Sequence, residues 1–395
     1  MENSRDTTLR ILAQRAVREL REQKERIGDR GSGGSSVIRL VNCLIAFGIE
    51  RSASDIHIEP QEDGVRLRYR SDGLLCEYDE TLSSDVISAL VSRIKVMAGM
   101  DIAQHQKQQD GHIRYSVNAK ELDIRVSILP ALYGETVVMR LMNMEDRLLQ
   151  LHELGFSAGN EAAVRTLIHK PAGLLLLCGP MNSGKTTTLY AAMSELNETA
   201  HNLVTLEDPI ERVLPGINQV QLNPKAGLTY PVGLRTILRQ DAETILLGEI
   251  RDEETAEMAV RIALTGHLIM TTLHTENAVS AIYRLLEMGV APYLLAATLS
   301  GIVAQRLVRR ICPKCKGIGC PTCHESGYYG RVALQEVLSM DDTLRDAILK
   351  RDARQTMEGL ARRNGMKTLW EDGKEKISIG ATTQEEVRRV LYGVV

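Results

Sequence analysis

Three things are scarce in this sequence of 395 residues: aromatic side chains, net charge and long apolar runs. Aromatic residues make up 4% of the chain, so aliphatic side chains must supply most of any hydrophobic core. The formal net charge of −3 gives no reason to expect general attraction to nucleic acid or to anionic lipid. The remaining composition, with 44% hydrophobic and 25% charged residues, is ordinary for a globular protein of two or three domains.

The sequence shows no segment that would direct it into a membrane or out of the cell. Residues 1–23 are charged throughout and contain no apolar region of the kind found in secretory signals. The uncharged stretch from Met288 to Gln305 is interrupted by Gly289, Pro292 and Gly301. It is therefore a poor match to a membrane span of about 20 apolar residues. We expect a cytoplasmic protein.

Four of the seven cysteines form two C-x-x-C knuckles, Cys312 with Cys315 and Cys320 with Cys323. Disulfides are rare in a reducing compartment, so the cluster predicts a metal site. Four thiolates suit a tetrahedral structural zinc ion and leave no position for a catalytic water. Four free cysteines are the alternative. We expect the adjoining His324 to lie at the surface. The single cysteines, which stand in apolar segments, are expected in the core: Cys43, Cys76 and Cys178.

Short alternating segments predict a small α+β domain over residues 37–145. Apolar residues at every second position favour strands in five places: residues 56–58, 65–69, 113–117, 122–128 and 137–141. A helical stretch from Asp85 to Met97 interrupts them. The size of this segment, about 100 residues, is within the usual range for a domain.

Residues 1–36 are expected to form a separate N-terminal segment. Apolar residues near helical spacing over residues 5–27 favour a short amphipathic helix. The glycine and serine run from Arg30 to Ser36 favours a flexible linker. A second helix is predicted from Val37 to Ile45, and Ser35 or Ser36 is available as its cap.

Buried strands and helices are predicted to alternate in the second part of the chain. The polar segment 146–158 is expected to link two domains. After it, four apolar runs lack polar alternation: residues 173–178, 203–206, 244–247 and 268–273. Such strands are buried on both faces, as in a parallel sheet covered by helices, so residues 159–395 predict an α/β domain. Residues 341–395 have helical patterns, and Thr383 to Glu386 fits a capping box.

Residues 179–186 match the phosphate-binding pattern G-x-x-x-x-G-K-[ST] at every specified position. The match follows a predicted strand and precedes a helical run, so backbone N–H groups and the helix dipole can both face the phosphates. Lys185 is expected to reach the β- and γ-phosphates, and the Thr186 hydroxyl to bind Mg²⁺. The residues predicted to bind nucleotide here are Gly179, Pro180, Met181, Asn182, Ser183, Gly184, Lys185, Thr186 and Thr187.

Two acidic segments follow in suitable positions. Glu207 and Asp208 end one apolar run, and Glu249 with Asp252 follows another. In an open parallel sheet the ligand lies at the carboxyl ends of the strands, where these groups would converge. One carboxylate can activate the attacking water while the other holds the Mg²⁺ shell. Either acid alone could instead cap a helix.

Four motifs in this order resemble the secretion-ATPase superfamily, the assembly motors of type II secretion and type IV pili. Residues 179–188 resemble its P-loop, with Met181-Asn182 where Thr-Gly is more usual. Three further segments resemble its Asp box, its atypical Walker B motif and its His box: residues 204–211, 248–252 and 265–275. The likeness continues through the N-terminal domain, at residues 54–60, 70–73, 109–111, 123–127 and 133–140, and covers about residues 37–390.

The resemblance implies roles for individual residues. It makes Glu207 the catalytic base, Glu249 the Walker B acid and His274 a candidate sensor, while His267 is expected to be structural. It also implies a RecA-like P-loop ATPase domain, a preceding PAS-like domain, and a zinc subdomain around residues 307–331. The interval between the two cysteine knuckles is shorter here than is usual in the family.

Five arginines match basic positions of the family. Arg125 and Arg140 match positions from which the N-terminal domain reaches a nucleotide, and Arg235, Arg239 and Arg251 match positions on the ATPase domain. Phosphoryl transfer develops charge that an arginine can neutralise, often from a neighbouring subunit. A surface ion pair is the alternative for each of them.

The resemblance implies a motor that hydrolyses Mg-ATP to drive pseudopilus or pilus assembly. By the same resemblance it would act as a homo-hexameric ring, peripheral at the inner face of the bacterial cytoplasmic membrane, against a membrane-embedded platform protein. The cofactors implied are ATP, Mg²⁺ and Zn²⁺. Three alternatives remain: a retraction-type motor, a zinc-ribbon DNA-binding or helicase-like ATPase, and a regulatory protein that binds nucleotide without turnover. The net charge and the lack of a basic, aromatic stripe count against direct contact with nucleic acid.

Overall fold

The computed structural model describes residues 34–78, 82–117, 120–143 and 147–393, and three single residues at 11, 14 and 18. Contacts between Cα atoms divide the chain into two compact units. The first consists of Met1–Arg147 and Lys314–Tyr329, and the second of Leu148–Pro313 and Gly330–Val395. The amphipathic helix predicted over residues 5–27, and most of the linker after it, lie outside the described residues.

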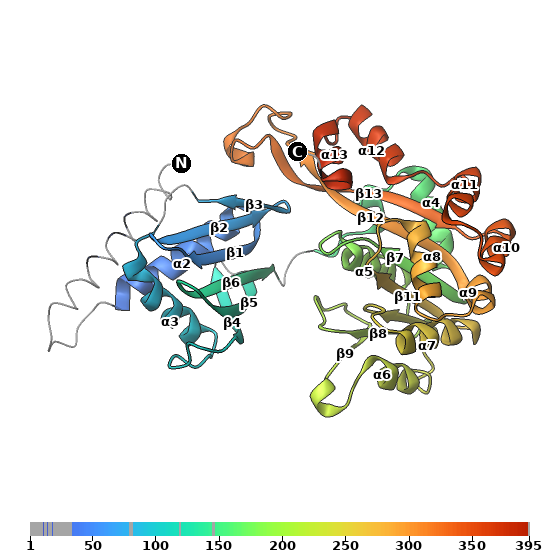
Figure 1. Ribbon diagram of the computed structural model, residues 1–395, viewed down its shortest axis with the longest axis horizontal. Helices are drawn as coiled ribbons and strands as arrows, with labels where there is room; N and C mark the ends of the chain where they lie inside the picture. The colour runs from blue at the N-terminus through green and yellow to red at the C-terminus, as the bar shows by residue number, and fades with distance from the viewer. Residues whose placement is uncertain are drawn as a thin grey trace. The chain divides into compact units, whose positions relative to one another are not determined.

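An antiparallel sheet with two helices makes up the main part of the first unit (Figure 1). The strands run in the order β3-β2-β1-β6-β5-β4. Their bounds are β1 Ala53–Pro60, β2 Val65–Ser71, β3 Leu74–Glu77, β4 Gln109–Val117, β5 Lys120–Ala131 and β6 Gly134–Asn143. Helices α2 (Gly34–Glu50) and α3 (Ile87–Met97) pack on each other and on the sheet, and alternate strand residues such as Ile56 and Ile58 face them. The intervening residues, among them His57 and Glu59, are only partly buried.

A seven-stranded sheet forms the centre of the second unit, in the order β13-β12-β7-β11-β10-β8-β9. The inner strands β12, β7, β11, β10 and β8 are parallel, as is the pairing of β8 with β9. The strand bounds are β7 Gly173–Cys178, β8 Leu203–Glu207, β9 Asn218–Gln221, β10 Thr244–Leu247, β11 Leu268–Leu273, β12 Leu299–Ile311 and β13 Tyr328–Ser339.

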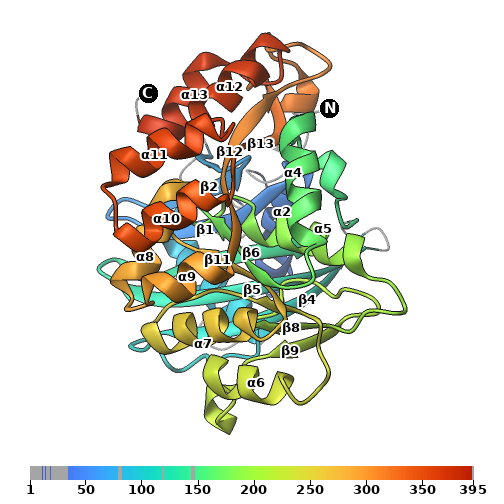
Figure 2. The ribbon, with the colours of Figure 1, turned by 90° about the vertical axis from the view of Figure 1, so that its right-hand side faces the viewer.

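Helices cover both faces of this sheet (Figures 1 and 2). Leu174 and Leu176 of β7 join a cluster with the helices between β9 and β12, whereas Leu175 and Leu177 join a second cluster with the helices that flank β7. The bounds of these helices are α4 Ala158–Ile168, α5 Lys185–Leu196, α6 Tyr230–Ile237, α7 Glu253–Leu264, α8 Ala278–Glu287 and α9 Pro292–Thr298. Burial on both faces explains why these strands carry continuous apolar runs.

Four helices complete the second unit after β13. They are α10 Asp342–Lys350, α11 Arg354–Arg363, α12 Leu369–Ser378 and α13 Gln384–Tyr392. Figure 2 shows them beside β12 and β13, and a small apolar cluster joins the two strands to α12 and α13 through Val308, Leu334, Leu369 and Val387. Among the described residues, none of the helices combines the length and the apolar character needed to cross a bilayer.

The predicted α/β architecture and its buried parallel strands are confirmed, while several local predictions need correction. Helix α2 begins at Gly34, so Ser35 and Ser36 lie inside its first turn and do not cap it. Cys178 is buried as expected, but Cys76 is exposed because it lies on β3, a short strand at the edge of its sheet. Strands β3, β9, β12 and β13 were not predicted.

The predicted linker between the two domains is partly buried. Within the segment expected to link two domains, Leu151 and Leu154 are buried in the second unit, in the cluster that contains α4 and α5. The PAS-like character of the N-terminal domain and the finer subdivision of the chain stay predictions.

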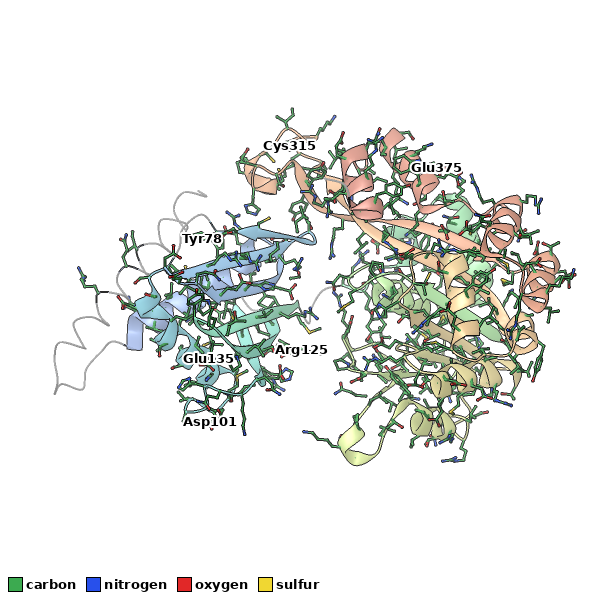
Figure 3. All side chains as sticks on the ribbon, in the orientation of Figure 1. Tyr78, Asp101, Arg125, Glu135, Cys315 and Glu375 are labelled. Atoms are coloured by element: carbon green, nitrogen blue, oxygen red, sulfur yellow. The ribbon has the colours of Figure 1, made fainter. Side chains whose placement is uncertain are left out.

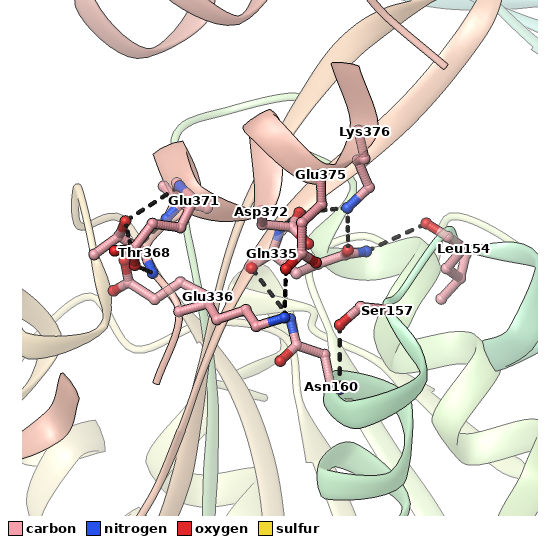
Figure 4. A network of polar contacts seen from close by, with 12 residues as sticks. Leu154, Ser157, Asn160, Gln335, Glu336, Thr368, Glu371, Asp372, Glu375 and Lys376 are labelled. Atoms are coloured by element: carbon pink, nitrogen blue, oxygen red, sulfur yellow. Dashed lines mark hydrogen bonds and ion pairs between the residues drawn. The ribbon is translucent and has the colours of Figure 1, made fainter. Parts of the chain in front are cut away.

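A buried polar network fastens α12 to β13 and to the segment before α4 (Figure 4). The Gln335 backbone N–H donates to Asp372 Oδ2 at 2.9 Å, and its side-chain Nε2 donates to the Leu154 carbonyl at 3.2 Å. Lys376 Nζ donates to Gln335 Oε1 at 3.2 Å and pairs with Asp372, while Asn160 Nδ2 donates to the Gln335 carbonyl at 3.3 Å. The network joins segments that are far apart in the sequence, so it stabilises the attachment of the C-terminal helices.

Asp372→Ala is expected to lower the free energy of unfolding by about 3–5 kcal/mol, because the buried Lys376 ammonium loses its counter-charge. Urea-induced unfolding measures this loss. The matched control is Glu375→Ala on the same helix, because Glu375 forms an exposed pair with Lys367 and should contribute less than about 1 kcal/mol. Equal effects of the two substitutions would contradict this account of the network.

A second prediction concerns pH. Glu386 accepts hydrogen bonds from the Arg309 backbone N–H, from the Arg309 guanidinium and from Arg389, at 2.5–3.0 Å. Burial alone would raise the pKa of Glu386, but the hydrogen bonds from Arg389 and Arg309 outweigh it and hold the pKa at about 2. Because this pKa lies below the ordinary value of 4.5, the carboxylate stabilises the fold above about pH 4.5 and loses that effect as the pH falls towards 2.

Glu386→Gln is therefore expected to destabilise the chain at neutral pH. Its difference in unfolding free energy from the wild type should shrink as the pH is lowered from 4.5 towards 2, measured by denaturant titrations at several pH values. A difference that stays constant over this range would show that the Glu386 charge contributes nothing.

Candidate functional site

The phosphate-binding pattern lies between the carboxyl end of β7 and the start of α5. Gly184 has a φ of 86°, in the left-handed region that glycine adopts without strain. A Cβ atom at this position would also lie 2.6 Å from Gln305 Nε2. The backbone turn thus requires the glycine, and a side chain here would also displace the Gln305 amide.

Lys185 is held inside the loop that it follows. Its Nζ donates to the carbonyl oxygens of Gly179 and Pro180, each at 2.8 Å, and the residue is 8% exposed. Burial lowers the pKa of Lys185 to about 8, although the nearby Glu249 carboxylate acts in the opposite direction. A phosphate group placed in the loop would favour the charged ammonium and replace the two carbonyls as its partner.

Glu207 ends β8 and is fixed by three hydrogen-bond donors. Tyr190 Oη donates to Glu207 Oε2, Thr205 Oγ1 donates to Oε1 at 2.6 Å, and Gln219 Nε2 donates to Oε1 at 3.2 Å. Tyr190 lies on α5, so the helix that begins at the phosphate-binding loop also holds this carboxylate. Burial and the Glu207 carboxylate together raise the pKa of Tyr190, which keeps its hydroxyl protonated as a donor. These three donors hold the orientation of the Glu207 carboxylate.

Glu249 follows β10 and lies among oppositely charged groups. Arg251 pairs with Glu249, and a second guanidinium nitrogen of Arg251 lies 3.5 Å from Asp208 Oδ2. His274 Nε2 lies 3.4 Å from Glu249 Oε2. Burial, followed by the Lys185 charge, lowers the pKa of His274, while Glu249 raises it. A histidine that lies near both a carboxylate and an ammonium can respond to the charge of a bound ligand.

Strand order explains why these groups meet. Strands β7, β11, β10 and β8 are neighbours in this order and parallel, so their carboxyl ends lie at one edge of the sheet. The phosphate-binding loop, His274 and Glu249 follow β7, β11 and β10 respectively, and Glu207 is the last residue of β8. His267 precedes β11, where its carbonyl accepts from the Gly173 N–H, so it lies at the opposite end of the strand from His274.

The five predicted arginines lie in three different places. Arg251 joins the acidic cluster described above. Arg235 of α6 pairs with Glu254 of α7 at 2.9 Å, and Arg239 donates to the Arg235 carbonyl, so both are engaged at the surface of α6. Arg125 and Arg140 belong to the first unit, on β5 and β6, where Figure 3 labels Arg125.

The four clustered cysteines meet as the spacing predicts. The Sγ atoms of Cys312, Cys315, Cys320 and Cys323 all lie within 4.8 Å of one another. Cys323 Sγ is 3.7 Å from Cys315 Sγ and 3.6 Å from Cys320 Sγ. Tetrahedral coordination with Zn–S bonds of about 2.3 Å requires sulfur separations of about 3.8 Å, so these residues fit a zinc ion. His324, which is partly buried and lies beside the cluster in sequence, is not one of the four ligands.

Backbone N–H groups also point at the sulfur atoms. Gly319 N–H donates to Cys315 Sγ at 3.3 Å, and Cys320 N–H donates to Cys323 Sγ at 3.2 Å. Hydrogen bonds of this kind to the ligand atoms are a common feature of protein metal sites. Figure 3 labels Cys315 in this segment, which joins β12 to β13.

Several residues around the site were not found from the sequence. Tyr190 and Gln219 hold Glu207, and Gln305 of β12 contacts the phosphate-binding loop. None of them belongs to a motif with a fixed spacing from the loop. Gln305 stands in the uncharged stretch that was considered only as a membrane segment, and a lone amide in an apolar run was the available signal.

Comparison with known proteins agrees with this geometry. The model of a family described as "Type II/IV secretion system protein" matches residues 31–389. The type II secretion system protein HxcR of Pseudomonas aeruginosa is 46% identical over 365 residues, which cover 90% of this chain and 78% of that protein. The type II secretion system ATPase E of Vibrio cholerae is 43% identical over 379 residues, covering 90% of this chain and 75% of that protein.

Solved structures share the fold. The ATPase DotB of Legionella pneumophila gives a TM-score of 0.69 at 22% identity, over 89% of this chain and 94% of that one. The pilus retraction motor PilT with bound ADP gives a TM-score of 0.61 at 26% identity, over 87% of this chain and 94% of that one. The resemblance inferred from the four motifs is thereby confirmed, and the chain belongs to the family of type II/IV secretion system proteins.

Proposed function

We propose that this protein hydrolyses Mg-ATP and uses the energy to assemble a pseudopilus in a type II secretion system. One observation carries the proposal. A buried lysine in a phosphate-binding loop lies at the sheet edge where Glu207, Glu249 and His274 also meet. The names of the relatives at 43–46% identity support the secretion role.

We infer the following roles at the site. The backbone N–H groups of the loop and the Lys185 ammonium bind the phosphates and neutralise their charge. The Thr186 hydroxyl and the Glu249 carboxylate offer oxygen atoms of the kind that Mg²⁺ prefers. Bound Mg²⁺ supplies charge neutralisation during phosphoryl transfer.

Glu207 is the proposed base for the attacking water. Its carboxylate receives two hydrogen bonds at Oε1 and one at Oε2, so Oε2 keeps an acceptor position for a water. His274, 3.4 Å from Glu249, is the proposed sensor of the bound phosphate.

The arginines are proposed to complete the site. Arg251 already neutralises Glu249 and Asp208. Arg235 and Arg239 are engaged only in weak surface contacts, so a nucleotide at a neighbouring subunit could attract them without a large loss of stability. Arg125 and Arg140 are proposed to approach the phosphates from the first unit. These roles accord with a homo-hexameric ring in which subunits share sites.

The same proposal extends to partners and location. The motor is proposed to be cytoplasmic, to lie at the inner face of the bacterial cytoplasmic membrane and to act on a membrane-embedded platform protein. The tetracysteine cluster is proposed to hold a structural zinc ion, because its four ligands leave no open position. A retraction motor is the second candidate, favoured by the likeness to PilT, but that likeness stands at 26% identity against 43–46% for the secretion proteins.

Lys185→Ala is expected to reduce Mg-dependent ATP turnover by about 100-fold or more, because the charge that develops on the phosphates loses its main counter-charge. Turnover of the wild type, measured over a range of protein concentrations, should rise more than proportionally if subunits complete one another's sites. The exposed Lys225→Ala is the control and should leave both results unchanged. Turnover strictly proportional to concentration would argue against the ring, and an active Lys185→Ala variant would argue against the site.

A single zinc ion per chain is expected in the purified protein, measured by elemental analysis. Cys315→Ser or Cys320→Ser should lower this content towards zero and make the segment between β12 and β13 sensitive to proteases, because metal binding and local folding are coupled. Cys76→Ser, which changes an exposed cysteine outside the cluster, should retain the zinc. A zinc-free wild type with a protected segment would show that the cluster is stable without metal.

A further inference from the structure

Gln305 is a buried amide with no role in the function proposed above. It lies on β12 and is 2% exposed. Strand β12 pairs in parallel with β7, with Ala304 opposite Cys178, so Gln305 lies beside the first residue of the phosphate-binding loop. Its backbone carbonyl is also close, because a Cβ atom at Gly179 would lie 2.5 Å from it.

The side chain of Gln305 bridges the loop and the helix that follows it. Nε2 donates to the Ser183 carbonyl at 2.8 Å, and Oε1 accepts from Thr188 Oγ1 at 2.9 Å. A carbonyl oxygen can only accept, so the amide nitrogen must face Ser183, which fixes the orientation of the side chain. A polar group in this buried position is stable only because both ends are bonded.

The contact with Ser183 controls the direction of a neighbouring N–H group. The C=O of Ser183 and the N–H of Gly184 belong to one planar trans peptide, so they point in opposite directions. When Gln305 holds the Ser183 carbonyl from the β12 side, the Gly184 N–H points away from Gln305 within the same peptide plane. In a loop of this type, that is the side on which backbone N–H groups bind phosphate oxygens.

A neighbouring residue keeps β12 in place against the loop. Arg306 Nη1 donates to the Gln305 carbonyl at 2.9 Å, and Arg306 Nη2 donates to the Glu276 carbonyl at 2.7 Å. Glu276 belongs to the segment after β11 that contains His274. The Gln305–Arg306 pair therefore connects the phosphate-binding loop with the segment of the proposed sensor.

We propose that Gln305 is a positioning residue for phosphate recognition, acting through the Ser183 carbonyl to aim the Gly184 N–H at a bound phosphate. The inference rests on the proposed nucleotide site and extends it to a strand outside the four sequence motifs. Gln305 touches no phosphate itself.

Gln305→Leu keeps the approximate volume but loses both hydrogen bonds, and Gln305→Glu keeps the acceptor for Thr188 while placing an oxygen against the Ser183 carbonyl. Both variants should bind inorganic tripolyphosphate with Mg²⁺ about tenfold more weakly than the wild type, which corresponds to about 1.4 kcal/mol. The KM for ATP should rise by a similar factor, with a smaller change in kcat, because the lost contact serves binding. Isothermal titration and steady-state kinetics measure these effects.

Two controls separate positioning from general stability. Thr188→Val removes only the second hydrogen bond and should change tripolyphosphate affinity less than about threefold. Gln335→Leu removes an equally buried glutamine on the adjacent strand β13, which bonds to Leu154 and Lys376 and not to the loop. It should lower the thermal unfolding midpoint and leave the affinity of the folded protein unchanged.

If the wild type binds tripolyphosphate and both Gln305 variants bind it equally well, the inference is overturned while the proposed function stands. If Thr188→Val loses as much tripolyphosphate affinity as Gln305→Leu, the contact with Ser183 is not what positions the Gly184 N–H. If the wild type binds neither tripolyphosphate nor ATP, the proposed function and the inference fall together. Should Gln305→Leu not fold, Gln305→Glu decides alone.

Discussion

The parallel pairing of β7 with β11 on one side and with β12 on the other determines where the candidate site lies. Parallel strands bring their carboxyl ends to one edge, and here β7 contributes the phosphate-binding loop, β11 His274 and β12 Gln305. Strands β10 and β8 continue the series with Glu249 and Glu207. Each residue reaches the site because it lies within two residues of the carboxyl end of its own strand or, for Gln305, beside the carboxyl end of β7.

Such a site depends on a fixed register between the strands of the sheet. A shift of one residue would turn Leu174 and Leu176 towards the cluster that now holds Leu175 and Leu177. All four are leucines, so side-chain identity alone would oppose such a shift only weakly. The loop favours the observed register over a shifted one, because Gly179 and Gly184 have no side chain to clash with Gln305. The close approach of β12 and the position of the glycines therefore fix the register together.

The sequence allowed the central strands and the chemistry to be predicted, since both depend on local signals. Continuous apolar runs mark strands buried on two faces, and G-x-x-x-x-G-K-T specifies its own backbone conformation. Long-range contacts left no such signal. Nothing local shows that Gln305 bonds to Ser183, 122 residues away, or that Tyr190 holds Glu207. Cys76 was misjudged because an apolar neighbourhood does not reveal that its strand lies at the edge of a sheet.

The arginines of the first unit show how register can indicate function where spacing cannot. Cross-strand pairing aligns His112 of β4, Arg125 of β5, Arg140 of β6, Asp55 of β1 and Arg70 of β2 in one row. The buried Asp55 carboxylate accepts from Arg140 Nε at 3.0 Å and lies 3.7 Å from Arg70 Nε. Arg125 stands directly opposite Arg140, and like charges opposite each other in a sheet are unfavourable.

Arg140 has a structural partner in the buried Asp55, whereas its pairing with Arg125 adds a contact between like charges. An anion placed over the row would attract both guanidinium groups at once and so offset their mutual repulsion. Without an anion, Asp55 of β1 reduces the repulsion between Arg125 and Arg140, because it neutralises Arg140. The strand register therefore brings together the two arginines for which a role at a nucleotide is proposed above.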